Sequence, residues 1–598
     1  MPKDAPYMEM EERVCLGVSR SFRGRKWTYR HNPETLESYA AKTGLPHLKA
    51  ALLSGRNVAE TEVERFLNPT LKNSLPNPSD LSDNDKAAGL ILDHITAAHR
   101  ITLFSDYDVD GGTSAAQLIR WGRAIGYEFG LYVPDRVKEG YGPSEAAFDQ
   151  LKSESVDMVI TLDCGAAAND ALNHADKIGL PVIVVDHHLM DHTPPPALAL
   201  VNPNRQDDTS GQGHLAAAGV TFMLLVALNR EARARGLTAN IDLKSLLGLT
   251  ALGTICDVVP LRGVNRAIVR QGLKVLSSNR NIGIEALADA GSIEPPYTTY
   301  HAGFVLGPRI NAGGRIGRAD MGAELLSTEN AQTAYAHAAE LDRVNQRRRQ
   351  MQDRILSEAL ELAQSQQDAP IIIVAMPDWH PGIIGIVAGR LKDRFGKPAI
   401  VIGVDNDSVS PVAKGSGRSI SGVDLGSALA AAKAEGLLTS GGGHAMAGGL
   451  SMSPEGIEAL RVFMCDRLSE DVEAALKNES TKLDFVLALS AVDKELMQVI
   501  DSVGPYGAGN PQPIFGFSGV NVSFAKRTKG DHVRFTLSDP NGSSISGICF
   551  GAGESGLDEA LLMAGPQRFH AIGRLKENVW NGRTTIDFHL LDLAPVMD

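Results

Sequence analysis

The chain has 598 residues, enough for about three to five domains, and a globular composition with 43% hydrophobic and 22% charged residues. Its five cysteines form no Cys-x-x-Cys pair, its first residues lack the pattern of a secretion signal, and no apolar run reaches the roughly 18 residues of a membrane helix, so we expect a cytoplasmic protein without a membrane span. A net charge of −13 excludes a surface that is basic throughout, but it is compatible with a basic channel in an acidic body.

The first 75 residues are predicted to form an N-terminal extension. Within it, the stretch SRSFRGRKWTYR (19–30) interleaves basic side chains with Phe22, Trp27 and Tyr29. Basic residues among aromatic ones suit single-stranded nucleic acid, because bases stack on the rings while phosphates are neutralised. The same pattern is expected of an extension that packs on a neighbouring domain, and the sequence leaves both interpretations open.

From about residue 98 to 205, short apolar runs alternate with helical segments. The runs are ITLFS (101–105), YEFGLYV (127–133), VDMVITL (156–162), PVIVV (181–185) and LALVN (198–202). This alternation predicts an α/β domain with a parallel sheet covered by helices. Such sheets bind ligands at the carboxyl ends of their strands.

Acidic and imidazole side chains follow these strands directly. Asp106, Asp108 and Asp110 come after the first run, and in an extended stretch such alternate residues would point the same way. The third run is followed by Asp163, the fourth by Asp186, His187 and His188, and the helical stretch LLGLTALGTICDVV delivers Asp257. We therefore expect these groups to meet at one edge of the sheet.

Carboxylate oxygens with imidazole nitrogens suit Mn²⁺ or Mg²⁺ better than a thiolate-rich zinc site does. Two such ions about 3.5 to 4 Å apart, bridged by a shared carboxylate, can activate water and stabilise an in-line attack on phosphorus. A lone Asp at a strand end is more often a helix cap or a turn residue, and Asp106 in particular could act only by supporting its neighbours. The convergence of three strands and a distant helix favours the metal site.

The rest of the chain predicts four further parts. Residues 242–290 are predicted to be helical, and a long polar helix is predicted from about Thr328 to Gln367. The segments PIIIVAM, PAIVIGV and TSGGGHAMAGGL then predict a second α/β unit that ends in a helix near 454–475. From about 481, short strands between Gly, Asn and Pro turns predict a small β-barrel of the OB type. The predicted domains are 1–75 (extension), 76–325 (catalytic α/β domain), 326–368 (connecting helix), 369–477 (smaller α/β domain) and 478–598 (barrel).

The motifs DYDVDG, TLDCG, DHH and GTICDVVPL, in this order, resemble the four motifs of the DHH phosphoesterases. GGGHAMAGG with KGSGRSI resembles the DHHA1 domain that follows them in that family. VPDRVKEGYG, LGPRINAGGR, WHPGIIGIVAGRL and GPYGAGNPQPIF narrow the resemblance to the RecJ family of single-strand-specific DNA exonucleases, over roughly residues 75 to 595.

The resemblance implies roles for the clustered residues. The implied metal ligands are Asp108, Asp110, Asp163, His187 and Asp257, with Asp163 as the bridge. The implied catalytic residues are His188, which would face the scissile phosphate, Asp186, which would orient its neighbours through hydrogen bonds, and Asp106. Other branches of the superfamily, such as the family II pyrophosphatases, have a histidine where this chain has Phe104, so one ion here would have fewer protein ligands.

The resemblance also implies residues that grip the strand. They are Arg136, Arg309, Ser416, Arg418 and Ser419, since arginine forks and small hydroxyls suit phosphates, although an ordinary salt bridge is the alternative for each arginine. Gly442 and Gly443 are interpreted as a Gly-rich loop that opens a helical segment and binds phosphate, with a tight turn as the alternative, and His444 would touch that phosphate or pack. Of the arginines in the connecting helix, Arg348 with Asn345 resembles a family pattern, and the others are expected on a solvated face.

The implied function is a metal-dependent 5′→3′ exonuclease that degrades single-stranded DNA to mononucleotides in repair and recombination. It would use two divalent cations, Mn²⁺ or Mg²⁺, act as a monomer, and cooperate with a helicase and a single-strand-binding protein. The barrel would hold the strand, with His532, Arg534 and Phe535 as candidates, or serve as a protein adaptor. Two other functions stay open: hydrolysis of short oligoribonucleotides or cyclic dinucleotides, and a replication scaffold without activity.

Overall fold

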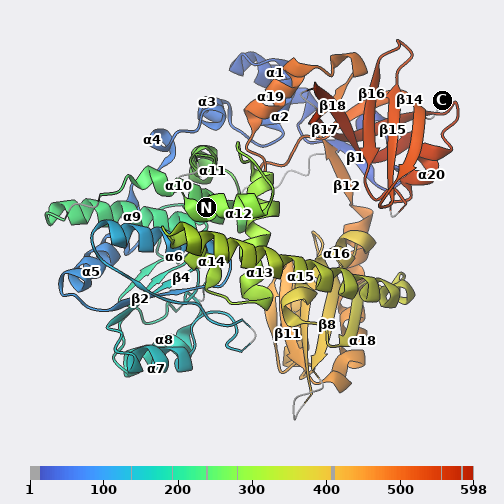
Figure 1. The fold of residues 1–598 in the computed structure, drawn as a ribbon. Helices are drawn as coiled ribbons and strands as arrows, with labels where there is room; N and C mark the ends of the chain where they lie inside the picture. The colour runs from blue at the N-terminus through green and yellow to red at the C-terminus, as the bar shows by residue number, and fades with distance from the viewer. Residues whose placement is uncertain are drawn as a thin grey trace. The chain divides into compact units, whose positions relative to one another are not determined.

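The computed structural model describes residues 14–136, 138–190, 193–237, 240–278, 281–405, 411–553, 555–580 and 583–596. The chain divides into two compact units (Figure 1). The central unit is Pro69–Ala475, and the terminal unit combines Met1–Asn68 with Leu476–Asp598. None of the helices in the described ranges has both the length and the apolar character needed to cross a bilayer.

A parallel five-stranded sheet forms the first half of the central unit, as the sequence predicts. Its strand order is β3-β2-β4-β5-β6, and the strands are β2 (Ile101–Ser105), β3 (Gly130–Tyr132), β4 (Met158–Leu162), β5 (Val182–Val185) and β6 (Ala199–Val201). All residues of β2, β4, β5 and β6 are buried, which explains their nearly continuous apolar sequences. The carboxyl ends of all five strands therefore lie along one edge.

Helices cover both faces of this sheet. One face carries α7 (Glu145–Ser153) and α8 (Asn169–Lys177), whose apolar residues pack with Phe104 and Val184. The other face carries α5 (Asn84–Thr96), α6 (Val109–Ala124) and α9 (Ala217–Ala234) (Figure 1). Burial on both sides fixes the strand ends as a rigid platform.

The helical region predicted for residues 242–290 follows and is confirmed; in the structure it extends to residue 327. Its elements are η4 (Leu243–Leu246), α10 (Leu247–Cys256), α11 (Gly263–Leu276), α12 (Ile282–Ala290), the π-helix η5 (His301–Leu306), α13 (Gly307–Ile316) and α14 (Met321–Ser327). The predicted long helix is α15 (Ala331–Ala363), which begins at the Asn330 cap and packs along α12, α13 and α16. It carries the chain from the first sheet to the second.

The second sheet of the central unit has the order β10-β11-β9-β8-β7, in which only β7 and β8 are parallel. Its strands are β7 (Ile372–Pro377), β8 (Ala399–Asp405), β9 (Val412–Arg418), β10 (Ser440–His444) and β11 (Ala447–Met452), and its helices are α16 (Pro381–Phe395), α17 (Leu425–Ala434) and α18 (Ile457–Lys477). The helix predicted near 454–475 is thus confirmed.

The prediction that the glycines at 441–443 open a helical segment is wrong. These residues form β10, the edge strand of a hairpin with β11. Close packing explains several glycines in and around this hairpin: a Cβ atom on Gly443 would lie 2.3 Å from the Ala447 carbonyl oxygen, one on Gly426 of α17 would lie 2.7 Å from the Gly443 carbonyl oxygen, and one on Gly448 would lie 2.4 Å from Leu429. The glycines therefore reflect close packing around the hairpin and not the start of a helix.

The predicted barrel is the core of the terminal unit. Strands β14 (Phe515–Thr528), β15 (His532–Ser538), β16 (Ser544–Cys549), β18 (Arg583–Pro595) and β17 (Arg568–Trp580) pair in this order, and β14 pairs with β17 to close the ring. β13 (Phe485–Leu487) pairs with β14, and α20 (Leu557–Leu562) packs against β14 and β15. Phe517, Phe535, Phe569 and Phe588 fill the interior.

The N-terminal segment packs on this barrel. Strand β1 (Lys26–Tyr29) pairs in parallel with β12 (Ser480–Leu483), and Trp27 is fully buried with its indole N–H donating to the Asp592 carboxylate at 3.3 Å. Helices α1 (Pro33–Thr43), α2 (His47–Ser54), α3 (Val63–Leu67) and α19 (Lys494–Val503) complete the unit. Of the two interpretations of residues 19–30, the structure favours packing for Trp27.

Candidate active site

Three aspartates stand side by side where β2, β4 and β5 end. The backbone N–H of Asp106 donates to the Leu162 carbonyl at 3.1 Å, and the N–H groups of Asp163 and Asp186 donate to the next strand's Val185 and Val201, each at 3.0 Å. The sheet ladder thus continues one residue beyond each strand. All three side chains are buried at this edge.

Asp108 and Asp110 reach the same edge in a different way from the one predicted. They do not lie on an extended segment, because the chain turns at once into α6. Asp108 is the helix cap, with Oδ1 accepting from the N–H of Asp110 at 2.8 Å and of Gly111 at 3.2 Å. A Cβ on Gly111 would lie 2.5 Å from the Asp106 carbonyl oxygen, so only glycine permits this sharp return.

Asp110 lies in the first turn of α6 and is held from α9. Its two carboxylate oxygens accept from the backbone N–H of Ala217 at 2.6 Å and of Ala218 at 2.9 Å. These bonds also satisfy free N–H groups at the start of α9. The predicted convergence of the acids is therefore real, although the extended-strand argument for it is wrong.

Asp186 organises the two histidines that follow it. Its Oδ1 accepts from the backbone N–H of His187 at 2.7 Å, the N–H of His188 at 3.1 Å and the His188 ring Nδ1 at 2.8 Å. Its Oδ2 accepts from the N–H of Ala166 at 2.9 Å. Four hydrogen bonds on one buried carboxylate fix where both imidazoles point.

His187 lies at the centre of the cluster. Its Nε2 is 3.4 Å from Asp163 Oδ1, 3.5 Å from Asp257 Oδ2 and 3.9 Å from Asp110 Oδ2. Asp257 arrives from the carboxyl end of α10, as the sequence predicts. Ligand atoms within 4.8 Å of one another form three groups: Asp106, Asp108 and Asp163; Asp110, His187 and Asp257; and Asp163, His187 and His188.

The acids of this cluster repel one another. Burial, reinforced by neighbouring carboxylates, raises the pKa of Asp106, Asp110 and Asp163 well above the usual range, and burial together with Asp108 raises the pKa of Asp257 to about 7. Burial and the nearby His188 lower the pKa of His187. Bound cations would remove this repulsion, because an opposite charge favours the ionised carboxylates.

One pair within the cluster is already neutralised. Burial lowers the pKa of His188, but its hydrogen bond to Asp186 and the charge of Asp186 outweigh burial and raise that pKa to about 9. Burial raises the pKa of Asp186, but the hydrogen bond from His188 prevails and lowers it. His188 is therefore a cation held by Asp186, about two-fifths exposed beside the acidic groups.

The donor set fits divalent cations. Asp106 Oδ1, Asp163 Oδ1 and His187 Nε2 are buried and have no hydrogen-bond partner among the described residues. Buried polar atoms without a partner are costly unless a ligand completes them. Oxygen and imidazole donors match Mn²⁺ or Mg²⁺. Phe104 is fully buried and stacks on Tyr132 with ring centroids 5.1 Å apart, so this position supplies no ligand.

Tyr141 is a neighbour of the cluster that the sequence analysis did not single out. Its hydroxyl donates to the Asp163 carbonyl at 3.0 Å and lies 3.2 Å from His188 Nδ1. The signal was available, because Tyr141 lies between two glycines of the VPDRVKEGYG motif. It braces the loop after β4 against His188.

A group of arginines lies close to Tyr107 and Asp108, in the loop between β2 and α6. The Arg136 guanidinium lies 5.2 Å from the Tyr107 ring centroid, and Arg315 donates to the Gly382 carbonyl at 3.1 Å. Burial and the charges of Arg136 and Arg348 lower the pKa of Arg315 to about 10, and burial and Arg136 lower that of Arg418. Such mutual repulsion is typical of an anion site. Arg315 lies in the same LGPRINAGGR motif as the predicted Arg309.

Three predicted strand-binding residues have other contacts. Arg309 is buried, pairs with Asp342 of α15 at 2.9 Å and donates to the Val305 carbonyl at 2.8 Å. The Ser419 hydroxyl is buried and donates to the Val423 carbonyl at 2.7 Å. Phe535 is only 1% exposed, because residues along β15 alternate between interior and surface. These side chains are committed to packing.

The other predicted residues of the second sheet share rungs of that sheet. Gly442, Gly443 and His444 pair with β11 residues that pair in turn with Ser416, Gly417 and Arg418 of β9. Arg418 Nη1 donates to the Ser416 hydroxyl at 3.2 Å and to the Gly417 carbonyl at 2.7 Å. The register thus brings two separate sequence motifs together.

On the barrel, exposed aromatics lie near the remaining predicted residues. Phe524 and Phe550 are about half exposed, and Phe550 contacts the rings of His532 and His589 at 5.1 and 5.2 Å. A pocket of about 510 Å³ is lined by these two phenylalanines together with Arg534, Lys576 and His589, among others. Aromatic and basic groups line it together.

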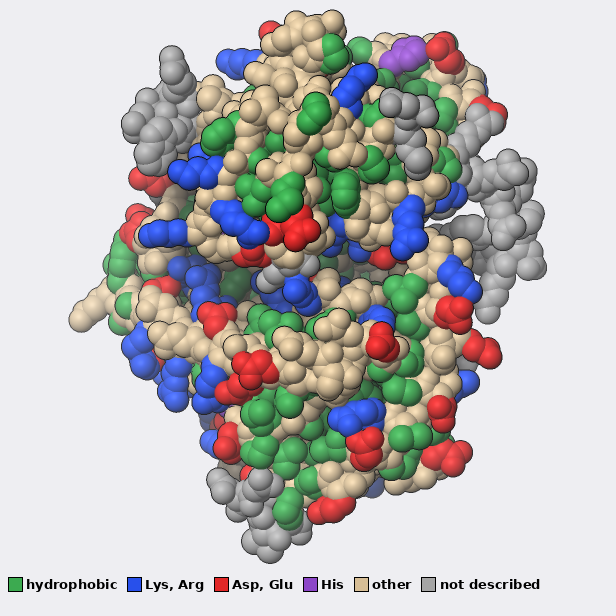
Figure 2. Space-filling view, turned by 90° about the vertical axis from the view of Figure 1, so that its right-hand side faces the viewer, with side chains coloured by type: hydrophobic (Ala, Val, Ile, Leu, Met, Phe, Trp, Pro, Cys, Tyr) green, Lys and Arg blue, Asp and Glu red, His purple; other side chains and the backbone are tan. Residues whose placement is uncertain are grey.

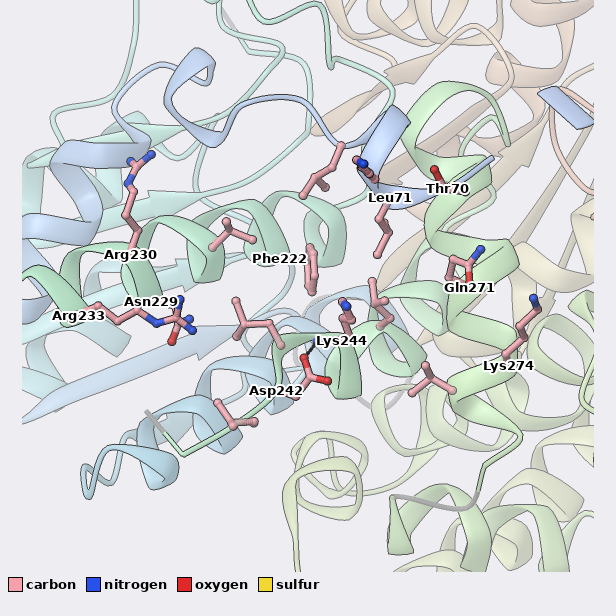
Figure 3. Close-up of a pocket in the computed structure, with 17 residues that line it drawn as sticks. Thr70, Leu71, Phe222, Asn229, Arg230, Arg233, Asp242, Lys244, Gln271 and Lys274 are labelled. Atoms are coloured by element: carbon pink, nitrogen blue, oxygen red, sulfur yellow. Dashed lines mark hydrogen bonds between the residues drawn. The ribbon is translucent and has the colours of Figure 1, made fainter. Parts of the chain in front are cut away.

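Another cavity, of about 1050 Å³, lies elsewhere in the central unit (Figure 3). Apolar residues such as Phe222 line it together with Arg230, Arg233, Lys244 and Lys274, from α9, η4 and α11. It shares no residue with the metal cluster. Acidic and basic side chains are intermixed over the face in Figure 2, so charge alone does not locate the site.

Comparison with known proteins identifies the parts of the chain. Residues 100–254 match the family model described as DHH family, N-terminal domain, residues 368–470 match the DHHA1 domain, and residues 483–592 match the RecJ OB domain. The single-stranded-DNA-specific exonuclease RecJ of Salmonella typhimurium is 34% identical over 534 residues, which are 86% of this chain and 91% of that protein.

Solved structures agree. The crystal structure of RecJ in complex with Mn²⁺ from Thermus thermophilus matches with a TM-score of 0.75 and 29% identity, over 94% of this chain and 78% of that one. The complex with Mg²⁺ from the same organism matches with a TM-score of 0.71 and 27% identity, over 95% and 78% of the two chains.

Proposed function

This chain belongs to the RecJ family of single-stranded-DNA-specific exonucleases, and from that membership we propose that it is a metal-dependent exonuclease that hydrolyses single-stranded DNA from the 5′ end to mononucleotides. The observation that carries the proposal is the convergence of five potential metal ligands: Asp108, Asp110, Asp163, His187 and Asp257. Asp163 Oδ1 and His187 Nε2 are buried there without a hydrogen-bond partner among the described residues. Without cations, so many acids at one sheet edge would be destabilising.

We propose these five residues as the ligands of two Mn²⁺ or Mg²⁺ ions. Asp163 belongs to two of the three groups of ligand atoms, one with His187 and His188 and one with Asp106 and Asp108, which supports a two-ion arrangement in which Asp163 would be shared. When bound, such a pair activates water and neutralises charge on the phosphate. The protein's own contribution is a buried platform that holds the donors in place.

His188 is proposed to act on the substrate directly. Burial lowers its pKa, but the hydrogen bond to Asp186 and the charge of Asp186 outweigh burial and favour the protonated ring, and about two-fifths of the side chain is exposed. A positive, hydrogen-bonding imidazole can stabilise the negative charge that develops on a phosphate oxygen. Asp186 then serves as a positioning residue. Asp106, whose buried Oδ1 has no hydrogen-bond partner among the described residues, lies beside the proposed ligands Asp108 and Asp163 and supports them.

The arginine group is proposed to hold the strand's phosphates. Arg136 and Arg418 lie near enough to Arg315 to lower its pKa, Arg136 also lowers the pKa of Arg418, and guanidinium forks match phosphate oxygens. Ser416 adds a hydroxyl beside Arg418. The same sheet holds Gly442, Gly443 and His444 of β10 in register with Ser416 and Arg418 of β9, across β11. This register supports a path for the DNA strand along β9 and β10.

Replacing Arg418 with alanine is expected to lower kcat/KM on a long single strand by about 10- to 100-fold, since a hydrogen bond to a charged group contributes roughly 1.5 to 3 kcal/mol. Arg418→Lys should recover only part of the loss, because lysine lacks the planar fork. Steady-state kinetics at several salt concentrations measure the effect. Arg343→Ala, at an exposed arginine paired with Glu340, should have parental kinetics; an equal loss there would refute a specific role.

Manganese should stabilise the central unit. At 100 times the dissociation constant, a ligand that binds only the folded state adds about 2.7 kcal/mol, which raises the unfolding midpoint by a few degrees. Thermal unfolding followed with Mn²⁺ and with a chelator measures this without any substrate. His187→Ala should remove the shift, whereas a shift that survives this change would place the ion elsewhere.

Further proposals concern organisation and partners. The domain boundaries 1–75, 76–325, 326–368, 369–477 and 478–598 are proposed as modules, and the matched family models lie within the second, fourth and fifth of them, apart from the first residue of the DHHA1 match. We place the protein in the cytoplasm as a monomer that works with a helicase and a single-strand-binding protein. The barrel pocket with Phe524, Phe550 and Arg534 is proposed to hold single-stranded DNA.

The deciding experiment is a digest of end-labelled DNA. Parent protein with Mn²⁺ or Mg²⁺ should shorten a 5′-phosphorylated single strand from its 5′ end, spare a duplex of the same sequence, and stop when chelator is added. A dinucleotide hydrolysed faster than the long strand would support the oligonucleotide alternative. An uncut single strand would support a scaffold without activity.

A further inference from the structure

Two aromatic rings are exposed on the π-helix η5 and at its start. Tyr300 is 62% exposed and Phe304 is 67% exposed, and their rings stack with centroids 5.3 Å apart and an interplanar angle of 20°. Val258, which directly follows Asp257, is 68% exposed. We call Tyr300 and Phe304 the aromatic platform. Large apolar side chains seldom remain this exposed together without a binding role.

The segment that carries the aromatic platform packs against Cys256, the residue before the proposed metal ligand Asp257. The Cys256 thiol donates to the Ala302 carbonyl at 3.5 Å, and a Cβ on Gly303 would lie 3.5 Å from Ile255. A Cβ on Gly307 would lie only 2.5 Å from the Cys256 sulfur. The η5 segment therefore packs directly against the end of α10, where the chain enters Asp257.

The helix that contains η5 also contacts the loop between β2 and α6, through its carboxyl-terminal part. η5 continues into α13, whose Asn311 side chain accepts from the Val109 N–H at 3.2 Å, and a Cβ on Gly314 would lie 2.5 Å from the Tyr107 carbonyl oxygen. At 1.5 Å per residue, Phe304 lies roughly 10 Å along the axis from Asn311. The rings are thus held at a fixed distance from the catalytic edge. π-Helical turns within a longer helix are frequent at functional sites.

We propose that the aromatic platform is a nucleobase-stacking subsite, in which a base of the bound strand stacks on Phe304 while Tyr300 backs the ring. The inference rests on the proposed function and deepens it. The arginine group supplies contacts to phosphates but none to bases, and an exonuclease that degrades any sequence needs base contacts that tolerate all four bases. Stacking on an aromatic face meets this need, because every base has a π-face.

Phe304→Ala tests the subsite in the full-length protein with Mn²⁺. Loss of one stacked base should raise KM for a long single strand by roughly 5- to 100-fold and leave kcat at saturation within about twofold. Phe304→Leu, which keeps apolar volume and the fold, should behave like alanine, and Phe304→Trp should restore the parental KM. Tyr335→Ala, which removes a partly exposed ring of α15 whose hydroxyl donates to Asp289 of α12, is the matched control and should change neither constant.

A series of strands that each lack one base locates the contact. In the parent, one position should weaken binding as much as Phe304→Ala does, and in the variant that position should have no further effect. 2-Aminopurine fluorescence at this position, measured with chelator so that no hydrolysis is needed, should be quenched by the parent and not by Phe304→Ala or Phe304→Leu. Parental KM and quenching in both variants would overturn the subsite and leave the proposed function intact, whereas a parent that cuts no single strand would overturn the function itself.

Discussion

Replacing Asp163 with alanine is expected to reduce hydrolysis of single-stranded DNA by about a thousandfold or more, while binding of the strand remains largely intact. The proposed ion pair supplies several kcal/mol of transition-state stabilisation, and each 1.4 kcal/mol corresponds to a tenfold change in rate. Asp163 is the carboxylate that two of the three groups of clustered ligand atoms share. Its loss should therefore disturb both ions at once.

Strand binding should survive because it depends on other residues. The arginine group and the barrel do not use Asp163, so the dissociation constant for a labelled single strand should change by less than about threefold. Single-turnover rates measured beside binding isotherms separate the two effects. Asp176→Ala, at an exposed acid on α8, is the matched control and should keep parental values for both. Residual cleavage within tenfold of the parent would show that Asp163 is not a shared ligand.

The second large effect concerns stability. Asp484→Ala is expected to destabilise the terminal unit by about 3 to 5 kcal/mol, because removing one partner of a buried ion pair leaves the other charge uncompensated. Asp484 is fully buried, lies 2.6 Å from the almost equally buried Arg56 and 3.2 Å from Arg30, and accepts from the Ile514 N–H at 2.9 Å. One carboxylate thus joins the N-terminal segment to the barrel.

Denaturant unfolding of the full-length protein, followed by fluorescence, measures this change. A double-mutant cycle with Arg56→Ala should show strong coupling, with the double variant much less destabilised than the two single changes added together. Lys42→Ala, which breaks an exposed ion pair with Glu60 in the same segment, should cost less than about 1 kcal/mol. A similar small loss for Asp484→Ala would mean that the N-terminal segment folds independently of the barrel.

Local sequence patterns were sufficient to predict the parallel sheet that carries the proposed active site. Its strands are continuous apolar runs because both faces are covered, and the functional residues follow the strand ends immediately. The position of Asp110 could not be predicted from local patterns alone. Alternation along an extended chain is a strand rule, whereas Asp108 ends the strand by capping α6, and Asp110 is held by N–H groups of α9, about 110 residues farther along the chain.

Long-range contacts account for the other differences. Glycines 441–443 have little local preference, and close neighbours explain two of them: a Cβ atom would lie 2.6 Å from Leu438 at Gly441 and 2.3 Å from the Ala447 carbonyl oxygen at Gly443. The ion pair of Arg309 with Asp342 could not be predicted, because Asp342 lies on a distant helix. The pairing of β1 with β12 joins residues more than 450 positions apart, and parallel pairing leaves no turn signal between them.

Anomalous diffraction from crystals grown with manganese tests the central claim most directly. Two peaks about 3.5 to 4 Å apart should appear among Asp108, Asp110, Asp163, His187 and Asp257, with Asp163 in contact with both. The account would be contradicted if this cluster held no anomalous peak while its side chains kept the positions described above.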